Sequence, residues 1–167
     1  IIEDASHAVG GSYLGQPVGN GRFSDLTVFS FHPVKIITTA EGGMVMTNDA
    51  QMAARLERLR SHGITRDPAV MEGEPEGPWV YEQVELGLNY RLTDLQAALG
   101  LSQLSQLETS VARRHQIACR YDAELAGLPL TTPWQSPDAR SALHLYPLQV
   151  DPARSPLTRR QLFDGLR

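Results

Sequence analysis

Two short apolar segments joined by a glycine-rich turn most constrain the fold of this chain. Residues 26–31 and 43–47 are rich in apolar side chains and bounded by glycine, serine or asparagine, which is typical of strands. Asn48 and Gln51 then have the spacing of a helix-opening capping box, and Gly63 is a natural helix end. A strand, a glycine turn, a strand and a helix in this order predict an α/β layer.

The remaining chain predicts further elements and a change of architecture. We expect an exposed proline- and glycine-rich loop over 65–83, a long helix with bends from the Thr93 capping box to Gly127, a strand over 143–150 and a helix opening at Thr158. The last two form a local α+β pattern that differs from the front half. We therefore expect a domain boundary near residue 127, with residues 1–127 in a large domain and 128–167 opening a small one.

Composition excludes several classes of partner. The chain has 167 residues, of which 41% are hydrophobic and 20% charged, and its net charge is -4. It contains no basic block that suggests a nucleic acid or a membrane surface, and no run of eighteen apolar residues. Its single cysteine, Cys119, has no partner within the chain, which fits a reducing compartment. We expect a cytoplasmic protein with a small soluble partner, no nucleic acid, no membrane and no metal.

Both ends of the sequence resemble interrupted secondary structure. Residues 1–4 are typical of the last residues of a buried strand, and the helix expected from Thr158 stops at Arg167. The expectation is an internal piece of a longer protein.

Lys35 lies where a chemically active lysine is expected. An amine that condenses with an aldehyde must be partly neutral and held still, which favours apolar strands and glycine turns over a solvated helix. Phe29, Phe31 and Val34 provide the apolar surroundings, and residues 42–43 are both glycine. This layout is typical of a pyridoxal phosphate lysine.

Asp4 is a candidate partner for the same cofactor. It follows an apolar strand end, and side chains at the carboxyl edge of an α/β sheet emerge into a crevice. A carboxylate there can hold a pyridine nitrogen protonated, which turns the ring into an electron sink. Taken alone, Asp4 also suits a turn or a helix cap, because Asp-Ala-Ser is a common sequence there.

Four segments in a fixed order carry a family resemblance. They are Glu3-Asp-Ala-Ser-His-Ala8, Ser30-Phe-His-Pro-Val-Lys35, Glu41-Gly-Gly43 and Leu88-Asn-Tyr-Arg-Leu-Thr-Asp-Leu-Gln-Ala-Ala-Leu99. From Ile2 to about Leu107, and more loosely to Leu166, the chain resembles the DegT/DnrJ/EryC1/StrS sugar aminotransferases. The resemblance implies an α/β fold: part of a fold-type I PLP-dependent transferase, with an aspartate aminotransferase-like large domain followed by part of a small α+β C-terminal domain.

The resemblance also implies roles for individual residues around pyridoxal 5'-phosphate. Lys35 would condense with the cofactor aldehyde and shuttle protons, and Asp4 would bind the pyridine nitrogen. His7 would contact the 3'-oxygen of the ring, Ser6 would pack against the ring, and Ser30 would hold the phosphate.

Of two further residues that the resemblance assigns, Asn89 implies a shared active site. Asn89 matches an asparagine that reaches the cofactor phosphate of the neighbouring subunit, and Arg91 is a candidate for binding a substrate carboxylate. A homodimer is therefore expected.

The substrate expectation comes from segments around the lysine. A lysine at position 35 indicates transamination instead of the related sugar dehydration. Residues 35–43, 59–67 and 77–83 resemble the branch that aminates C4 of a UDP-linked 4-keto-6-deoxy-N-acetylhexosamine in pseudaminic acid biosynthesis. Glutamate would be the amino donor and 2-oxoglutarate its product. The alternatives are a 4-amino-arabinose or perosamine type of aminotransferase, and an inactive fragment or regulator. An inactive chain would be expected to lose Lys35 or Asp4, and both are present.

Overall fold

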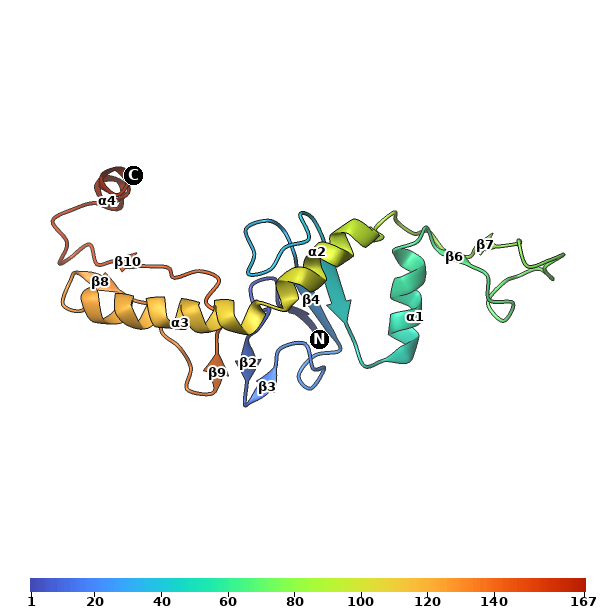
Figure 1. Cartoon of the computed structure of the whole chain (residues 1–167), viewed down its shortest axis with the longest axis horizontal. Helices are drawn as coiled ribbons and strands as arrows, with labels where there is room; N and C mark the ends of the chain where they lie inside the picture. The colour runs from blue at the N-terminus through green and yellow to red at the C-terminus, as the bar shows by residue number, and fades with distance from the viewer.

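The computed structural model describes residues 1–167 as an elongated molecule, in which helix α3 extends away from a small sheet crossed by α2 (Figure 1). The expected α/β class is confirmed. The strands are β1 (Ile2–Asp4), β2 (Ser12–Tyr13), β3 (Gln16–Pro17), β4 (Leu26–Ser30), β5 (Gly43–Met46), β6 (Ile64–Thr65), β7 (Glu82–Gln83), β8 (Leu130–Thr131), β9 (Ala139–Arg140) and β10 (Gln149–Val150). The helices are α1 (Ala50–Leu59), α2 (Asp94–Leu104), α3 (Leu107–Glu124) and α4 (Arg159–Gly165). None of these helices has the length and apolarity that a membrane crossing requires.

The central sheet has the strand order β1-β4-β5. Strands β4 and β5 confirm the two strands expected on either side of the glycine turn and pair antiparallel, with Ser30 opposite Gly43. Strand β1 runs parallel to β4, with Asp4 opposite Val28. The parallel pair brings the carboxyl ends of β1 and β4 to one edge of the sheet.

Strand β1 is more exposed than its sequence indicated. The expected strand end is present, but Ile1 is 80% and Ile2 72% exposed. Within these 167 residues the expected burial is not found, since β1 pairs only with β4.

Helix α1 begins one residue later than its capping-box spacing indicated. Asp49 is the N-cap, and its Oδ1 accepts hydrogen bonds from the backbone N–H groups of Gln51 and Met52 at 2.8 and 3.0 Å. Asn48, the expected cap, instead donates its Nδ2 to the Asn20 carbonyl at 2.9 Å. A carboxylate also interacts favourably with the positive end of the helix dipole. The helix ends earlier than the expected stop at Gly63: α1 closes at Leu59 with Arg60 as its C-cap, and the Gly63 N–H then bonds the Arg58 carbonyl at 2.8 Å.

The long helix expected from Thr93 is two helices. The Thr93 capping box is present and opens α2. The helix breaks at Ser105 and Gln106, where the Ser105 hydroxyl donates to the Ser102 carbonyl at 2.8 Å. Such a local side-chain bond competes with the regular helical pattern. Beyond α3, Gly127 has φ +85°, in agreement with the expected helix stop.

The proline- and glycine-rich segment is a loop with paired ends. Strands β6 and β7 pair antiparallel across residues 66–81, which form the expected exposed loop. Arg66 lies over the ring of Tyr81, with its Cζ 5.8 Å from the ring centroid. Trp79 remains 70% exposed in the same loop.

The C-terminal segment contains less strand than expected. Only Gln149–Val150 forms β10, which pairs with β8, so the expected strand over 143–150 is mostly wrong. The chain cannot be extended at Leu143, because this residue has φ +51°. Strand β9 pairs instead with β2 and joins the late segment to the front of the chain. The expected capping box at Thr158 is confirmed and opens α4.

Part of the buried core follows the inner face of α3, and the rest, Ala5, Phe31 and Ile37, lies at the sheet edge and in the lysine loop. Val111 is fully buried and Ala118 is 8% exposed, and they are accompanied in the core by Ala142 and Leu143. A Cβ built on Gly10 would lie 3.0 Å from Val111 Cγ2, so the turn after β1 packs directly against α3. The late segment lies beside the same turn, since a Cβ built on Gly11 would be 3.7 Å from the Ala142 backbone nitrogen.

Candidate active site at the carboxyl edge of the sheet

The predicted site residues from the front of the chain meet at one edge of the central sheet. Asp4 ends β1 and Ser30 ends β4, and these two strands are parallel neighbours. Lys35 follows in the loop that returns to β5 and is half-buried. Its positive charge is close enough to Asp4 to lower the pKa of that carboxyl. The edge therefore brings a carboxylate, a hydroxyl and an amine together.

Asp4 is held in its ionised form by its own turn. Its Oδ1 accepts the Ser6 hydroxyl at 2.6 Å and the Ser6 backbone N–H at 3.1 Å. These two hydrogen bonds lower the pKa of the Asp4 carboxyl below its ordinary value of 3.8, with smaller contributions from the charges of His7 and Lys35. Asp4 therefore does stabilise a turn, as its local sequence also suggested. Its second carboxylate oxygen, Oδ2, forms no hydrogen bond within the chain. Ser6 thus orients the Asp4 carboxylate, in addition to any contact that Ser6 itself makes with a bound ligand.

The loop that carries Lys35 is closed on itself. Phe31 donates its N–H to the Gly42 carbonyl at 2.8 Å, and Thr39 donates to the Phe31 carbonyl at 3.0 Å. The Lys35 N–H bonds the His32 carbonyl at 2.9 Å. These bonds hold the lysine backbone in place, as an amine that must react repeatedly at one position requires.

Helix α2 supports the same loop from one face. Gln103 accepts the Thr38 backbone N–H at 2.8 Å, and the Gln96 side-chain amide donates to the Glu41 carbonyl at 2.9 Å. Between them Gly100 approaches Thr39 so closely that an added Cβ would lie 2.8 Å from Thr39 Cγ2. The family-like segment of α2 thus positions the lysine loop.

Lys35 is the only lysine in a chain with fifteen lysine and arginine residues. Arginine stays charged at all accessible pH values, whereas a lysine amine can lose its proton and act as a nucleophile. The one amine of this type therefore stands where such chemistry is expected. This signal was available in the sequence and strengthens the assignment of Lys35.

The site includes a residue that the sequence did not predict. The ring of His144 lies against the ring of His7, with centroids 4.4 Å apart and planes inclined by 58°. The charges of His7 and Lys35 also act on His144. No local pattern marks His144, because it approaches the site only through the long-range packing of residues 141–144 on α3.

Asn89 and Arg91 do not join this group. Asn89 forms an isolated antiparallel bridge with Ser61 beside the end of α1, and its side chain is exposed without a hydrogen bond inside the chain. Arg91 is also exposed and forms no ion pair. Within one chain the structure brings Asp4, Ser6, His7, Ser30 and Lys35 to the edge and leaves these two side chains on the surface.

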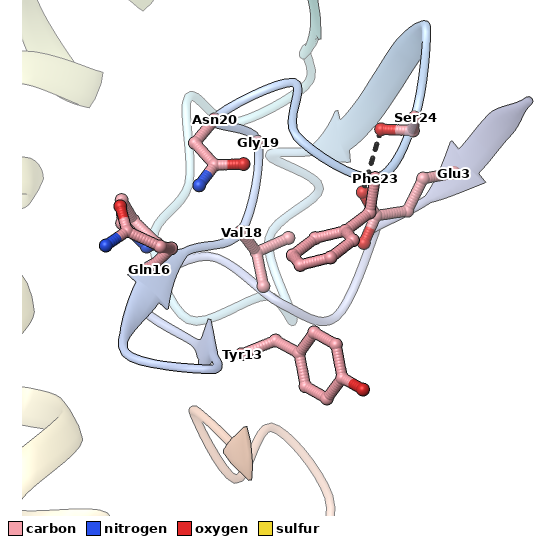
Figure 2. Close-up of a pocket in the computed structure, with 9 residues that line it drawn as sticks. Glu3, Tyr13, Gln16, Val18, Gly19, Asn20, Phe23 and Ser24 are labelled. Carbon is pink, nitrogen blue, oxygen red and sulfur yellow. Dashed lines mark hydrogen bonds between the residues drawn. The ribbon is translucent and has the colours of Figure 1, made fainter. Parts of the chain in front are cut away.

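A separate cavity of about 180 Å³ is lined by residues of the β2–β3 hairpin and the following loop (Figure 2). It contains Glu3, which alternates with Asp4 along β1 and so points to the other face. The Glu3 carboxylate is already bound by the hydroxyls of Ser24 and Thr27, at 3.2 and 3.1 Å. Both hydroxyls bind Oε2, so Glu3 links β1 to Thr27 of β4 on the face opposite Asp4.

The chemical groups at the edge fit a phosphorylated pyridine aldehyde. The Asp4 carboxylate is ionised and suits a protonated ring nitrogen, Lys35 provides the amine for the aldehyde, and the half-buried Ser30 hydroxyl is engaged only by a 3.5 Å contact with the His32 N–H. The observed donor set therefore agrees with pyridoxal phosphate.

Comparison with known proteins agrees with this chemistry. A profile of the DegT/DnrJ/EryC1/StrS aminotransferase family matches residues 1–167. A UDP-4-amino-4,6-dideoxy-N-acetyl-beta-L-altrosamine transaminase from Campylobacter jejuni is 40% identical over 153 residues, which are 91% of this chain and 38% of that protein.

Solved structures share the fold. A Streptococcus pneumoniae protein assigned as a sugar aminotransferase, in its PLP form, superposes on 91% of this chain and 37% of its own length, with a TM-score of 0.78 and 34% identity. Helicobacter pylori PseC, described as an aminotransferase involved in the biosynthesis of pseudoaminic acid, covers 91% of this chain and 38% of its own, with a TM-score of 0.76 and 35% identity. The chain thus spans about two fifths of the length of the relatives it matches. The expected partial fold-type I architecture is confirmed.

Proposed function

Because this chain belongs to the DegT/DnrJ/EryC1/StrS aminotransferase family, we propose that the protein is a pyridoxal-phosphate-dependent sugar aminotransferase. The observation that carries the proposal is the meeting of Asp4, His7 and Lys35 at the carboxyl edge of β1 and β4. The ordered lysine loop and the ionised carboxylate are what such a reaction needs from the protein.

The proposed roles divide binding from proton transfer. Asp4 holds the ring nitrogen of the cofactor protonated, Ser30 donates to its phosphate, and His7 and Ser6 contact the ring. When bound, pyridoxal phosphate supplies the electron sink that accepts charge from the amino carbon. The amine of Lys35, once free, removes a proton at that carbon of the donor and returns one to the acceptor.

The proposed acceptor is a UDP-linked 4-keto-6-deoxy-N-acetylhexosamine, aminated at C4 with glutamate as donor. The names of the Campylobacter transaminase and of Helicobacter PseC support this choice and a place in pseudaminic acid biosynthesis. A 4-amino-arabinose or perosamine type of substrate is the alternative within the family. Assays of each keto sugar with glutamate as the amino donor distinguish the proposed substrate from the alternative.

A homodimer with shared sites is part of the proposal. Asn89 is exposed and lies outside its own chain's site group, which agrees with a role toward a neighbouring subunit. The exposed Arg91 is kept as the proposed partner of a substrate carboxylate. The proposal also keeps residues 1–127 as part of the large domain, 128–167 as the start of the small domain, and a cytoplasmic location.

The decisive experiment is reductive labelling. The full-length protein is incubated with pyridoxal phosphate, reduced with borohydride and digested, and the modified peptide is located by mass spectrometry. The labelled peptide is expected to contain Lys35, the one lysine of these 167 residues. Lys35→Ala should remove that label, whereas Arg60→Ala on the exposed end of α1 should not.

The same experiment tests the inactive alternative. A protein that folds but retains no label on Lys35 would be a non-catalytic member of the family. Labelling followed by conversion of glutamate to 2-oxoglutarate would support the aminotransferase.

A further inference from the structure

The cavity at the β2–β3 hairpin is built between the hairpin and three other parts of the chain (Figure 2). Strand β2 pairs with β9 as well as with β3. The loop after β3 packs on β4, since a Cβ built on Gly19 would lie 2.8 Å from the Phe29 ring. The Asn20 carbonyl of this loop accepts the Asn48 side-chain amide at 2.9 Å. These contacts fix the walls of the cavity before any ligand binds.

Two aromatic rings form part of the cavity wall. The centroids of the Tyr13 and Phe23 rings lie 5.2 Å apart, with planes inclined by 67°. The face of an aromatic ring carries partial negative charge and attracts cations. Arg22 illustrates this attraction, because its Cζ lies 5.3 Å from the centroid of the Phe23 ring. Arg22 itself does not line the cavity, so the aromatic wall remains available to a bound group.

Glu3 is the one formally charged residue that lines the cavity. Its Oε2 accepts the hydroxyls of Ser24 and Thr27, and Thr27 is only 1% exposed. The carboxylate is therefore held in place from the buried side. Its Oε1 accepts no hydrogen bond within the chain and forms no ion pair. A carboxylate oxygen accepts its strongest hydrogen bonds from charged donors such as an ammonium group.

The volume of the cavity limits the size of its ligand. It measures about 180 Å³, whereas sites for drug-sized molecules measure roughly 300–1,000 Å³. An apolar cavity of about 150 Å³ is large enough to bind benzene. A nucleotide sugar is therefore too large for the hairpin cavity, and a small organic ion fits it.

We infer that the hairpin cavity is a binding site for a small alkylammonium ion. The N–H group of the ion donates to Glu3 Oε1, and its alkyl groups contact the rings of Tyr13 and Phe23. Glu3 and Asp4 alternate along β1, so this site lies on the face of the strand opposite Asp4. It is separate from the group around Lys35 and does not depend on the proposed function.

Two probes of similar shape test the recognition of charge. Trimethylammonium and tert-butanol each carry three methyl groups and one hydrogen-bond donor, and only the first is charged. A tertiary amine also cannot condense with the aldehyde of pyridoxal phosphate. Each probe is titrated into the full-length protein, and the ring resonances of Tyr13 and Phe23 are followed by NMR.

Trimethylammonium is expected to shift both ring resonances and to bind about tenfold more tightly than tert-butanol, because its donor is charged. Equal affinity for the two probes overturns the inference. So does a titration in which neither ring resonance moves.

Glu3→Gln tests the carboxylate directly. It retains an oxygen that can accept the hydroxyls of Ser24 and Thr27 but removes the negative charge. We expect its affinity for trimethylammonium to fall about tenfold, to that for tert-butanol. Glu57→Gln on the exposed surface of α1 removes the same charge away from the cavity and should leave both affinities unchanged.

The two variants also distinguish a local contact from a general effect of charge. Wild-type affinity in Glu3→Gln, or an equal loss in Glu57→Gln, overturns the inference. If Glu3→Gln does not fold, the comparison of the two probes in the wild-type protein decides the question.

Discussion

Gln103 of α2 accepts the backbone N–H of Thr38 at 2.8 Å, three residues beyond the lysine that carries the proposed chemistry. Gln96 lies two helical turns earlier and donates to the Glu41 carbonyl in the same loop. Lys35 therefore depends on a helix about sixty residues later in the chain for the position of its loop.

Gln103→Leu is expected to loosen the lysine loop. It removes the acceptor of a partly buried N–H, which costs about 1–3 kcal/mol when no new partner replaces it. The Thr38 amide should exchange its hydrogen faster, and pyridoxal phosphate should bind more weakly. Gln51→Leu on the exposed surface of α1 is the control. Unchanged exchange at Thr38 would show that the bond does not hold the loop.

Ser6→Ala is expected to raise the pKa of the Asp4 carboxyl, because the Ser6 hydroxyl is the main cause of its lowered value. A lowered folded pKa means that the stabilisation is present above the ordinary value of 3.8 and is lost as pH falls through the folded value. In Ser6→Ala that loss should move to higher pH. Carbon NMR titration of Asp4 measures the change, with Ser102→Ala on exposed α2 as control. The explanation is wrong if the Asp4 titration is the same in both variants.

Tyr146 is expected to titrate far above an ordinary tyrosine. Burial, followed by its hydrogen bond to Asp122 at 2.5 Å and the charge of Asp122, raises the pKa of the Tyr146 phenol to about 12. The resulting stabilisation is fully present below pH 10 and is lost as pH rises through about 12.

Asp122→Asn tests the contribution of the carboxylate. It should move the Tyr146 titration closer to the ordinary value of 10.0, as followed by the ultraviolet absorbance of the phenolate. Tyr146→Phe identifies which transition belongs to this residue. A Tyr146 pKa that stays at its wild-type value in Asp122→Asn would leave burial as the only cause.

Val111→Ala is expected to destabilise the fold by about 2 kcal/mol, because it removes two methyl groups from a fully buried site between α3 and the Gly10 turn. Denaturant unfolding of the full-length protein measures the change. Ile117→Ala is the matched control on the same helix, since Ile117 is 37% exposed and should cost less. An equal or larger loss for Ile117→Ala would contradict the position of the core.

Features encoded within a few residues could be predicted from the sequence. The capping boxes at Thr93 and Thr158 were correct because the two bonds of a capping box join residues three apart. Asn48 and Asp49 show the limit of such reasoning, since both are good caps. The choice between them depends on the tertiary bond from Asn48 to Asn20.

The sequence by itself determined which chemical groups are present and where they lie along the chain: Asp4 and Ser30 at strand ends, and the single lysine Lys35 in the loop after Ser30. The tertiary structure decided what surrounds them. Only the packing of residues 141–144 on α3 brings His144 to His7, and only the closing of the lysine loop brings Gln103 to Thr38. Such contacts join segments far apart in sequence, and their partners are set by the path of the whole chain, which residue spacing does not record.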